Sequence, residues 1–556
     1  MADFLIERLP ELSDFPPDQR NAAVELLLGI CHRQQREIVE LRQQVRVQGE
    51  QLQLQSEQIA LQAEQIQRLK DEIAILKGEK GRPNIKPSGL NKDVGDGEGS
   101  GQKKRGKPSH KKTHRLKIHH ELVLEPESIP DGSKFKGYKD YVVQDIEIKL
   151  SNTRYRRARY RTVDGKTVMG QLPAEVLGSH FGSALRTYIL SQYYQQHVPQ
   201  NLILREVLEF GICISAGELS QIITEGKDQF HAEKDDVLRA GLEVSSHINV
   251  DDTGARHQGR NGYCTHIGNE LFAWFSSSES KSRINFLELL CAGKTEYVID
   301  DVARRYMLQQ RLPKAQLALL AKDCVFANKV LWELYLQELG LNERCRRIIT
   351  EGALVANLLM QDNFPELVIM SDDAGQFNIT GFMNALCWVH AERNINKIIP
   401  FTDDNRQAQE LVRDQIWRLY QDLKAYKLTP ANGMKGALTT RFDEIFTQKT
   451  CFQTLNLALQ RIYANKQELL LVLQRPEIPL HNNLSENDIR DYVKKRKISA
   501  TTRSDEGRRS RDTLLSLKKT CQKLGISFRD YLYDRLSKLN VIPPLPELIR
   551  AAAQSP

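Results

Sequence analysis

Three short stretches carry acidic side chains in positions that could do chemistry. The stretch INVDDTGARHQG places Asp251 and Asp252 after an apolar run. The stretch LVIMSDDAGQF repeats the arrangement with Asp372 and Asp373. A single pair of this kind is usually a turn or the solvated end of a strand. Two apolar strands that both deliver acid at their ends suggest a shared site.

The third stretch is HNNLSENDIRDYVKKRKISATTRS, which predicts a helix that Asn482 or Asn483 can cap. Glu486 lies near the start of this helix, and cations recur along the same face at four-residue and three-residue spacing. These cations are Arg490, Lys494 and Lys497. Taken alone, the pattern is typical of a charged, solvated helix face.

Together, the three acids can converge on hard divalent cations, because oxygen ligands favour Mg²⁺ or Mn²⁺. Two such ions, about 4 Å apart, can clamp the attacking and leaving oxygens of a phosphoryl displacement. Alternation along a strand puts Asp251 and Asp252 on opposite faces, so at most one of them should bind metal directly.

The elements that must position these acids follow from short-range patterns. GYCTHIG and ELFAWFS are β-like runs separated by Gly268 and Asn269, which predicts a three-strand meander that begins with the Asp251 strand. RINFLELL at 283–290 predicts a helix. LVIM and NALCWVH predict buried strands, and the helix AERNINKI follows the second of them.

Composition places the chain among globular proteins of several domains. It has 556 residues, 40% of them hydrophobic and 27% charged, with a net charge of +8. Eight Lys or Arg and no acid fall in 102–120, and ten Lys or Arg against three acids fall in 494–519. Such clusters favour a polyanionic partner such as nucleic acid, although any single cluster could be solvated surface.

Cysteine usage and hydropathy predict a cytoplasmic protein. Nine cysteines are scattered without any C-x-x-C spacing, which indicates a reducing compartment and no zinc ribbon. The N-terminal residues lack the pattern of a signal peptide, and the apolar runs are too short to cross a bilayer.

Residues 33–78 hold a heptad repeat that predicts a coiled coil. The a positions are Ile38, Val45, Leu52, Ile59, Ile66 and Ile73. The d positions are Leu41, Gln48, Gln55, Gln62, Leu69 and Leu76. β-Branched residues at most a positions favour a parallel dimer, and the three Gln weaken its middle. The alternative is one long helix packed on its own chain.

The next region combines basic charge with short elements. Residues 79–116 read as a disordered linker, and alternation over 117–172 predicts strands. RYRRARYR, with five Arg, could lie on a nucleic-acid backbone or be an edge strand protected by charge. Residues 182–226 predict two helices around Gly211, with Ser215 as a cap. This pattern fits a helix-turn-helix and equally a plain αα-hairpin.

The chain resembles a bacterial DDE transposase of the IS66 insertion-sequence family. The resemblance rests on the ordered set VDDT, SDDAGQF followed by CWVHAER, HNNLSENDIR, and the tail SLKKTCQKLGISFRDYLYDRL. It also includes the zipper-like N-terminus, the basic KKRGKP segment and the helical stretch at 182–226. CWVHAER and the N-N-x-x-E-x-x-x-R pattern are its most specific pieces.

The resemblance implies an α/β (overall α+β) chain whose RNase H-like catalytic domain carries helical insertions near 300–362 and 403–470. The expected regions are an N-terminal helix and coiled coil for oligomerisation (1–78), a basic disordered linker (79–116), a β-ribbon plus helical DNA-binding region (117–240), the catalytic domain (241–510) and a C-terminal helical tail (511–556).

Residue by residue, the resemblance implies a catalytic and metal-binding triad of Asp251, Asp372 and Glu486. The residues expected to contact DNA are Arg490, Lys494, Lys495, Arg496, Lys497, Lys103, Lys104, Arg105, Arg156 and Arg157. Trp388 and His390 match the family's W-x-H positions, where they support the site or form ordinary core.

Three departures from the family pattern leave the triad in place, and one of them is the wide spacing of the acids, 121 residues from the first to the second and 114 from the second to the third. Relatives often carry a cysteine-pair zinc motif after the linker, but 119–172 has no cysteine, so no zinc is expected. This leaves the N-terminal mode of DNA binding open. The first block is VDDT, where relatives commonly have Glu after the first Asp.

The resulting expectation is a transposase that cuts and joins DNA with two Mg²⁺ or Mn²⁺ ions. Its partners are the terminal inverted repeats, target DNA, a second copy through the coiled coil, and accessory proteins encoded by the same element; no membrane is involved. A cytoplasmic, nucleoid-associated location follows. The alternatives are a nuclease of the same fold and a catalytically silent, transposase-derived DNA-binding protein.

Overall fold

The structure is a computed structural model in which the chain forms two compact units, Met1–Val143 and Gln144–Pro556. It describes residues 13, 16–19, parts of 28–48, 117–126, 128–146, 148–173, 176, 179–361 and 364–554.

Little of the predicted coiled coil lies within the described residues. A short 3-10 helix, η2, spans Pro17–Gln19, and helical residues recur between 28 and 48. Ile38 and Leu41, the first a and d positions, are more than half exposed. Most later heptad positions and the whole linker, including Lys103, Lys104 and Arg105, lie outside the described residues. The coiled coil and the basic linker stay predictions.

The Arg-rich segment forms a small hairpin, and the other strands predicted before it do not form. β1 (Arg159–Arg161) pairs with antiparallel β2 (Thr167–Met169). The described residues of 117–158 contain no strand, so the strand predicted for YVVQDIEIKL is wrong. Its alternating apolar side chains are left largely exposed, Ile146 by 85%. Alternation stabilises a strand only when one face is buried.

The helical region at 182–226 folds as predicted. α2 (Ser183–Leu190), the π-helical turn η5 (Ser191–Gln195), α3 (Gln200–Glu209) and α4 (Ala216–Thr224) precede the long helix α5 (Asp228–Val244). Gly211 has a φ of 82°, which glycine adopts without strain, and it ends α3. Ser215 and Glu218 form a complete capping box at the start of α4.

A five-stranded mixed sheet forms the centre of the second unit. Its strands are β3 (His247–Gly254), β4 (Tyr263–Gly268), β5 (Ala273–Ser278), β8 (Val368–Ser371) and β9 (Met383–Leu386). Their order is β5-β4-β3-β8-β9. β3, β4 and β5 form the predicted antiparallel meander, whereas β8 and β9 run parallel to β3. The predicted strand NALCWVH is half wrong, because β9 ends at Leu386 and a helix begins at Trp388.

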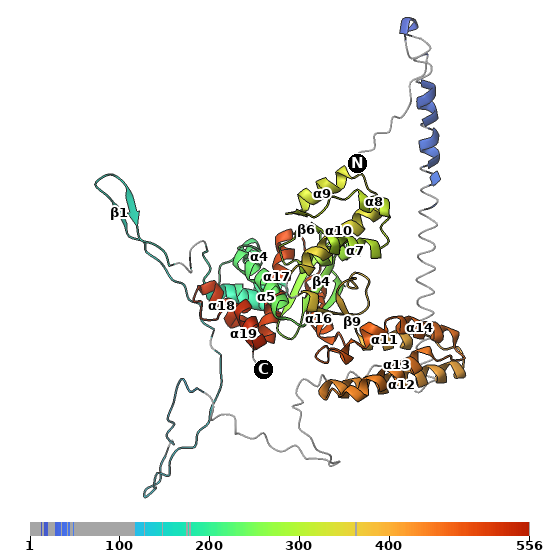
Figure 1. The fold of residues 1–556 in the computed structure, drawn as a ribbon. Coiled ribbons are helices and arrows are strands. Elements are labelled where there is room, and N and C mark those ends of the chain that lie inside the picture. Colours follow the sequence, from blue (N-terminus) through green and yellow to red (C-terminus); the bar gives the residue numbers. More distant parts are fainter. Residues whose placement is uncertain are drawn as a thin grey trace. The chain divides into compact units, whose positions relative to one another are not determined.

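Two groups of helices follow the sheet strands along the chain. The first contains α6 (Arg283–Leu290), β6 (Tyr297–Ile299), α7 (Asp301–Gln309), α8 (Lys314–Ala318), β7 (Cys324–Phe326), α9 (Lys329–Glu338), the almost wholly buried α10 (Glu343–Leu359) and η6 (Phe364–Glu366). The second contains α11 (Trp388–Asn396), α12 (Asp403–Leu428), α13 (Asn432–Thr447), α14 (Gln453–Ala464), α15 (Lys466–Leu469) and η7 (Leu471–Leu473). Helices α11 to α14 lie together in Figure 1 and enclose a hydrophobic core of their own.

The last four helices belong to the body of the unit. They are α16 (Asn483–Ser499), α17 (Asp505–Lys523), α18 (Phe528–Ser537) and α19 (Leu545–Gln554). One hydrophobic core joins residues of α2 to α5, the meander, α6 to α10 and α16 to α19, so the predicted C-terminal tail packs into it. Among the described residues, no helix is long and apolar enough to cross a membrane.

Helix α17 covers the free edge of the sheet through its own side chains. The backbone N–H groups of Ala273, Phe275 and Ser277 on β5 donate to side-chain oxygens of α17 at 2.7–3.2 Å. The acceptors are Thr520, Ser516 and Asp512. Four helical residues rise about 6 Å and two strand residues about 6.8 Å, so the two spacings match over this length. An edge that would otherwise offer unpaired donors is thereby closed.

We expect Ser516→Ala to lower the free energy of unfolding by about 1–3 kcal/mol, because the Phe275 N–H would be left buried without an acceptor. Urea denaturation followed by circular dichroism measures this change. Thr440→Ala on the exposed face of α13 is the matched control and should change stability by less than about 0.5 kcal/mol. Equal effects of the two substitutions would contradict the role of Ser516.

Candidate active site

Asp251 lies where β3 loses one of its two neighbours. The parallel ladder between β3 and β8 ends at the pair Asn249–Met370, whereas the antiparallel ladder with β4 continues to Gly254. The two aspartates are therefore inside β3 rather than at its end, which corrects the sequence-based expectation. On the side of β3 that faces β8, however, Asp251 and Asp252 lie beyond the last paired residue, Asn249. The β3 backbone there can form hydrogen bonds with groups other than β8.

The second pair of aspartates follows β8 directly. The Asp372 carboxylate accepts a hydrogen bond from the Ala374 backbone N–H at 3.2 Å. Asp373 has a φ of 75° and accepts from Asn465 Nδ2 at 3.1 Å, so its side chain is engaged with the second group of helices. Asp372 thus remains the second acid of the candidate site.

Asn482 fills the gap beside β3 and fixes the start of α16. It is fully buried; its Nδ2 donates to the Val250 carbonyl at 2.8 Å, and its Oδ1 accepts from Asn249 Nδ2 at 2.9 Å. Asn482 stands at the N-cap position of α16, but no cap hydrogen bond comes from its side chain. The predicted capping role is therefore wrong, because the Asn482 amide is used to join the helix to the sheet.

Helix α16 lies over the face of the sheet that carries Asp251. Asp251 is paired with His266 across the β3–β4 ladder, so their side chains share one face. His266 Nδ1 lies 2.6 Å from Ser485 Oγ, and its Nε2 lies 3.2 Å from the Asp488 carboxylate, both on α16. Asp251 therefore faces the helix that carries Glu486.

Asp252 belongs to the opposite face, as strand alternation predicts. Its carboxylate accepts hydrogen bonds from Thr265 Oγ1 at 2.5 Å and from Gln376 Nε2 at 2.8 Å. These bonds occupy both carboxylate oxygens. Of the first pair, Asp251 is the acid placed with Glu486.

Asp251 is buried close to other negative charges. Burial and the charges of Asp372, Asp252 and Glu486 raise the pKa of Asp251 from 3.8 to about 7, although a hydrogen bond from the Asp252 backbone N–H opposes the shift. Burial also raises the pKa of Asp252. Burial is the larger cause at Asp251, so such a pKa indicates a partly desolvated site in which a further negative charge is disfavoured.

Glu486 lies among basic side chains from two helices. Its Oε2 lies 3.4 Å from Arg490 Nη2, and its Oε1 lies 3.7 Å from His390 Nε2 and 3.8 Å from Arg393 Nη2. Oε1 is buried and has no hydrogen-bond partner within the described part of the chain. Burial lowers the pKa of His390, whose Nε2 is also 3.0 Å from Arg393 Nη1. His390 is therefore part of the site's surroundings.

Trp388 has a structural role instead. It is buried, its Nε1 donates to the Leu469 carbonyl at 2.9 Å, and its ring meets the Phe442 ring edge-on at 5.9 Å between centroids. Of the two residues in the W-x-H motif, Trp388 therefore belongs to the core and His390 lies beside Glu486.

Most of the cations predicted on α16 face solvent, but one does not. Arg490, Lys494 and Lys497 are exposed, and Arg496 is partly buried with Nη1 3.5 Å from Thr253 Oγ1. Lys495 is fully buried over the Tyr193 ring, 3.1 Å from its centroid, and donates to the Tyr193 carbonyl at 2.6 Å. The prediction that Lys495 binds DNA is wrong. Burial lowers the pKa of Lys495 to about 6.

The remaining predicted basic contacts lie on the Arg-rich hairpin. Arg156 and Arg157 are exposed just before β1, and Arg157 Nε donates to the Gly170 carbonyl at 2.6 Å. They are available to a polyanion, but no described contact joins them to the three acids.

Sequence reasoning missed three residues of the site: Asn482 as a link to β3, His266, and Arg393. A buried Asn or His gives no local pattern, since its partners come from distant strands. Arg393 could have been found, because His390, Arg393 and Lys397 share one face of a helix at i, i+3 and i+7.

The acids offer oxygen ligands but no assembled metal cluster. Among the described residues, no group of three His, Cys, Asp or Glu side chains is close enough together to hold a metal ion. The donor set and the unpartnered Oε1 of Glu486 nevertheless suit a hard divalent cation. A bound cation would also favour the ionised form of the buried Asp251 carboxyl.

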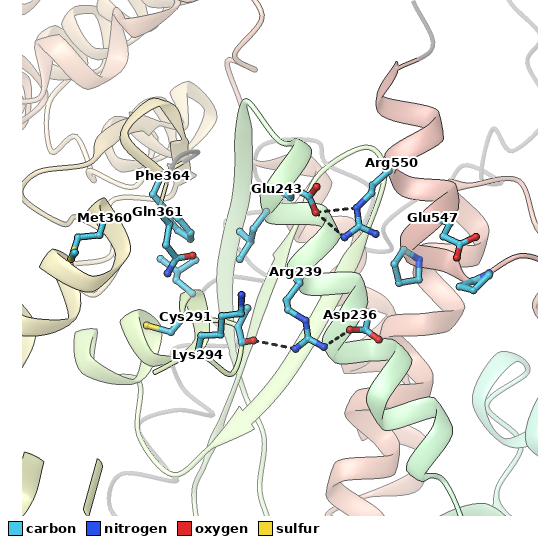
Figure 2. Close-up of a pocket in the computed structure, with 15 residues that line it drawn as sticks. Asp236, Arg239, Glu243, Cys291, Lys294, Met360, Gln361, Phe364, Glu547 and Arg550 are labelled. Atoms are coloured by element: carbon cyan, nitrogen blue, oxygen red, sulfur yellow. Dashed lines mark hydrogen bonds and ion pairs between the residues drawn. The ribbon is translucent and has the colours of Figure 1, made fainter. Parts of the chain in front are cut away.

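A cavity of about 780 Å³ elsewhere in the unit lacks these features (Figure 2). None of the three acids lines it. Charged side chains on its walls pair with each other, Arg550 with Glu243 at 2.7 Å and Arg239 with Asp236. The functional assignment therefore rests on the acids at β3, β8 and α16.

The fold and the acids can now be compared with known proteins. A family model described as "Transposase IS66 family" matches residues 351–510, a span that includes Asp372 and Glu486 but not Asp251. Residues 351–510 therefore form a domain of the IS66 transposase family. The uncharacterized protein y4jO of Sinorhizobium fredii is 42% identical over 323 residues, which are 57% of this chain and the whole of that protein.

We expect Asp251→Asn to stabilise the metal-free protein in a pH-dependent way. A raised pKa means that ionising Asp251 is harder in the folded state, so wild type loses stability as the pH rises from about 4 to about 7. The Asp251→Asn variant does not lose this stability, because Asn does not ionise. Its advantage should be near zero at pH 4, grow towards pH 7, and level off above it at roughly 1–4 kcal/mol.

Chemical denaturation at several pH values with a chelator present measures this difference. Asp414→Asn, at an exposed position on α12, makes the same chemical change and should show no such trend. An Asp251→Asn variant that is less stable than wild type at pH 8 would show that the surroundings of Asp251 do not disfavour its ionised form.

Proposed function

We propose that this protein is a DDE-type transposase that cuts and joins DNA by metal-dependent phosphoryl transfer. The observation that carries the proposal is the placement of Asp251 on the sheet face covered by α16, the helix that carries Glu486, and beside β8, which Asp372 directly follows. Family membership gives the general activity, and the acids supply the chemistry. The mixed sheet, with Asp251 inside β3 and Asp372 directly after the adjacent parallel strand β8, supports an RNase H-like catalytic domain.

Asp251, Asp372 and Glu486 would hold two Mg²⁺ or Mn²⁺ ions, drawing closer together than they are without metal. The bound ions would activate the attacking oxygen and stabilise the leaving one. The protein itself supplies the positions: Asn482 and His266 fix α16 over β3, and Asp252 is held on the other face by Thr265. Water would attack in cleavage and a DNA 3′-hydroxyl in joining, so no Ser or Tyr nucleophile is required.

The exposed cations of α16 would hold the DNA backbone next to the acids. Arg490, Lys494 and Lys497 continue from Glu486 along one helix face. Such contacts with phosphates fix the position of the strand without reading its sequence.

Recognition of the element's ends would come from other parts of the chain. The Arg-rich hairpin presents exposed cations, which supports a role on DNA. Helix α4, the second helix of the predicted helix-turn-helix, contains Glu218 and no Lys or Arg. If α4 entered a DNA groove, neighbouring elements would have to supply the contacts with the phosphates. Pairing of two ends by an N-terminal coiled coil, and any accessory protein, remain part of the proposal.

Two other functions fit the same geometry: a nuclease that cuts without joining, and a DNA-binding protein without catalysis. Retention of all three acids, with the raised pKa of Asp251, favours catalysis. Strand-transfer products would separate the transposase from the nuclease.

We expect Glu486→Gln to abolish Mg²⁺-dependent cleavage of DNA carrying the element's own ends, while binding of that DNA changes by less than about threefold. The substitution keeps the shape of the side chain and removes the charge that a metal ion needs. Gel analysis of cleavage and a mobility-shift assay give the two readouts. Glu410→Gln at an exposed position on α12 is the control and should cut normally. Normal cutting by Glu486→Gln would overturn the triad.

Neighbouring lysines on α16 should behave in opposite ways. Lys494→Gln should weaken DNA binding and reduce the slope of log K against log salt by about 0.9, the value for one lost phosphate contact. Lys495→Gln should leave that slope unchanged and lower the free energy of unfolding, because it removes buried contacts with Tyr193. Salt-dependent binding and urea denaturation of both variants test this pair. A reduced slope for Lys495→Gln would show that Lys495 reaches DNA.

A further inference from the structure

Helix α11 is held in a fixed orientation by one of its faces. Trp388, Glu392 and Ile395 recur at i, i+4 and i+7 and are all buried. The Glu392 carboxylate accepts from Arg413 Nε of α12 at 2.6 Å, and Trp388 donates to the Leu469 carbonyl. The opposite face of α11 is therefore presented in a defined direction.

That opposite face carries basic side chains next to the acids. It contains His390, Arg393 and, one turn further, the exposed Lys397. Arg393 Nη2 lies 3.8 Å from Glu486 Oε1, and its side chain is 41% exposed. Helices α11 and α16 thus bring cations to the Glu486 carboxylate from two directions.

The contact between Arg393 and Glu486 is loose for an ion pair. At 3.8 Å it is longer than a hydrogen bond, and Oε1 has no other hydrogen-bond partner among the described residues. Arg393 therefore offsets negative charge at the site without saturating the carboxylate oxygen. A divalent cation bound at that oxygen would compete with Arg393 for the same negative charge and repel its guanidinium.

We propose that Arg393 exchanges partners during the reaction: it neutralises Glu486 in the free protein and binds a DNA phosphate when metal and DNA are present. The exchange rests on the metal-dependent function proposed above. A guanidinium suits the second role, because its fork of N–H donors matches phosphate oxygens. Helix α11 then forms a second phosphate-binding wall facing the cationic face of α16, and Lys397 extends it by one turn, about 5.4 Å.

The exchange predicts opposite effects of one substitution on two ligands. Without DNA, Arg393→Gln should bind Mn²⁺ about threefold to tenfold more tightly than wild type, because a competing charge is gone. With Mg²⁺ replaced by Ca²⁺ to prevent cutting, the same variant should bind a DNA duplex about threefold to tenfold more weakly, with a salt slope smaller by about 0.9.

The measurements are Mn²⁺ titration followed by electron paramagnetic resonance and fluorescence anisotropy with a labelled duplex, both on the full chain. Arg393→Lys keeps the charge and should retain wild-type Mn²⁺ affinity with partial DNA binding. Arg418→Gln, at an exposed position on α12, makes the same charge change away from the acids and should alter neither.

Each outcome decides between defined alternatives. Tighter Mn²⁺ with weaker DNA binding supports the exchange. A variant that loses affinity for both ligands shows that Arg393 only keeps the site folded, and unchanged affinities show that it has no role; either result overturns the inference. If wild type binds no Mn²⁺ at all, the metal-dependent function proposed above is wrong. If wild type binds Mn²⁺ but Arg393→Gln has neither predicted effect, only the exchange is wrong.

Discussion

The amide of Asn482, buried between β3 and the first turn of α16, is the contact on which the candidate site depends. The amide lies where the β3–β8 ladder ends. There it donates a hydrogen bond to the Val250 carbonyl, which has no partner on β8. The next residue of β3 is Asp251, and Glu486 follows one helical turn after Asn482. The Asn482 side chain therefore fixes the positions of Asp251 and Glu486 relative to each other, because it joins the backbone beside Asp251 to the first turn of the helix that carries Glu486.

The rest of α16 is held by buried charge rather than by apolar packing alone. Asp488 contacts His266 at 3.2 Å and Lys523 at 2.9 Å, and although burial opposes it, these partners lower the pKa of Asp488 to about 2. One turn further, Asp491 contacts Lys518 and His197 at 2.5 and 3.0 Å. A network of this kind is costly unless every partner is in place, and so it favours one arrangement of α16 on α17 and the meander.

The sequence predicted correctly those features that depend on residues close together in the chain. The meander, the turn at Gly211 and the cap at Ser215 depend on neighbouring residues, and the structure has them. Alternation at 141–150 failed because a strand also needs a surface, which no local pattern reports. Lys495 was misplaced for a related reason: one cation in a basic run turns inward only because Tyr193, far away in sequence, offers its ring and carbonyl. The acids were found as separate stretches, but their shared face required the pairing of Asp251 with His266.

The division of the second unit into separate cores has a consequence for cooperativity. Asp251 belongs to a strand of the main core, whereas His390 and Arg393 stand on α11, whose buried face belongs to the core of α12 to α14. Segments with their own cores can open at different free energies, so unfolding need not be all-or-none. Local opening of the α11–α14 group would remove His390 and Arg393 from Glu486 while the sheet stayed folded and Arg490 stayed in place. The working lifetime of the site is then set by the weaker of the two cores rather than by the global stability of the chain.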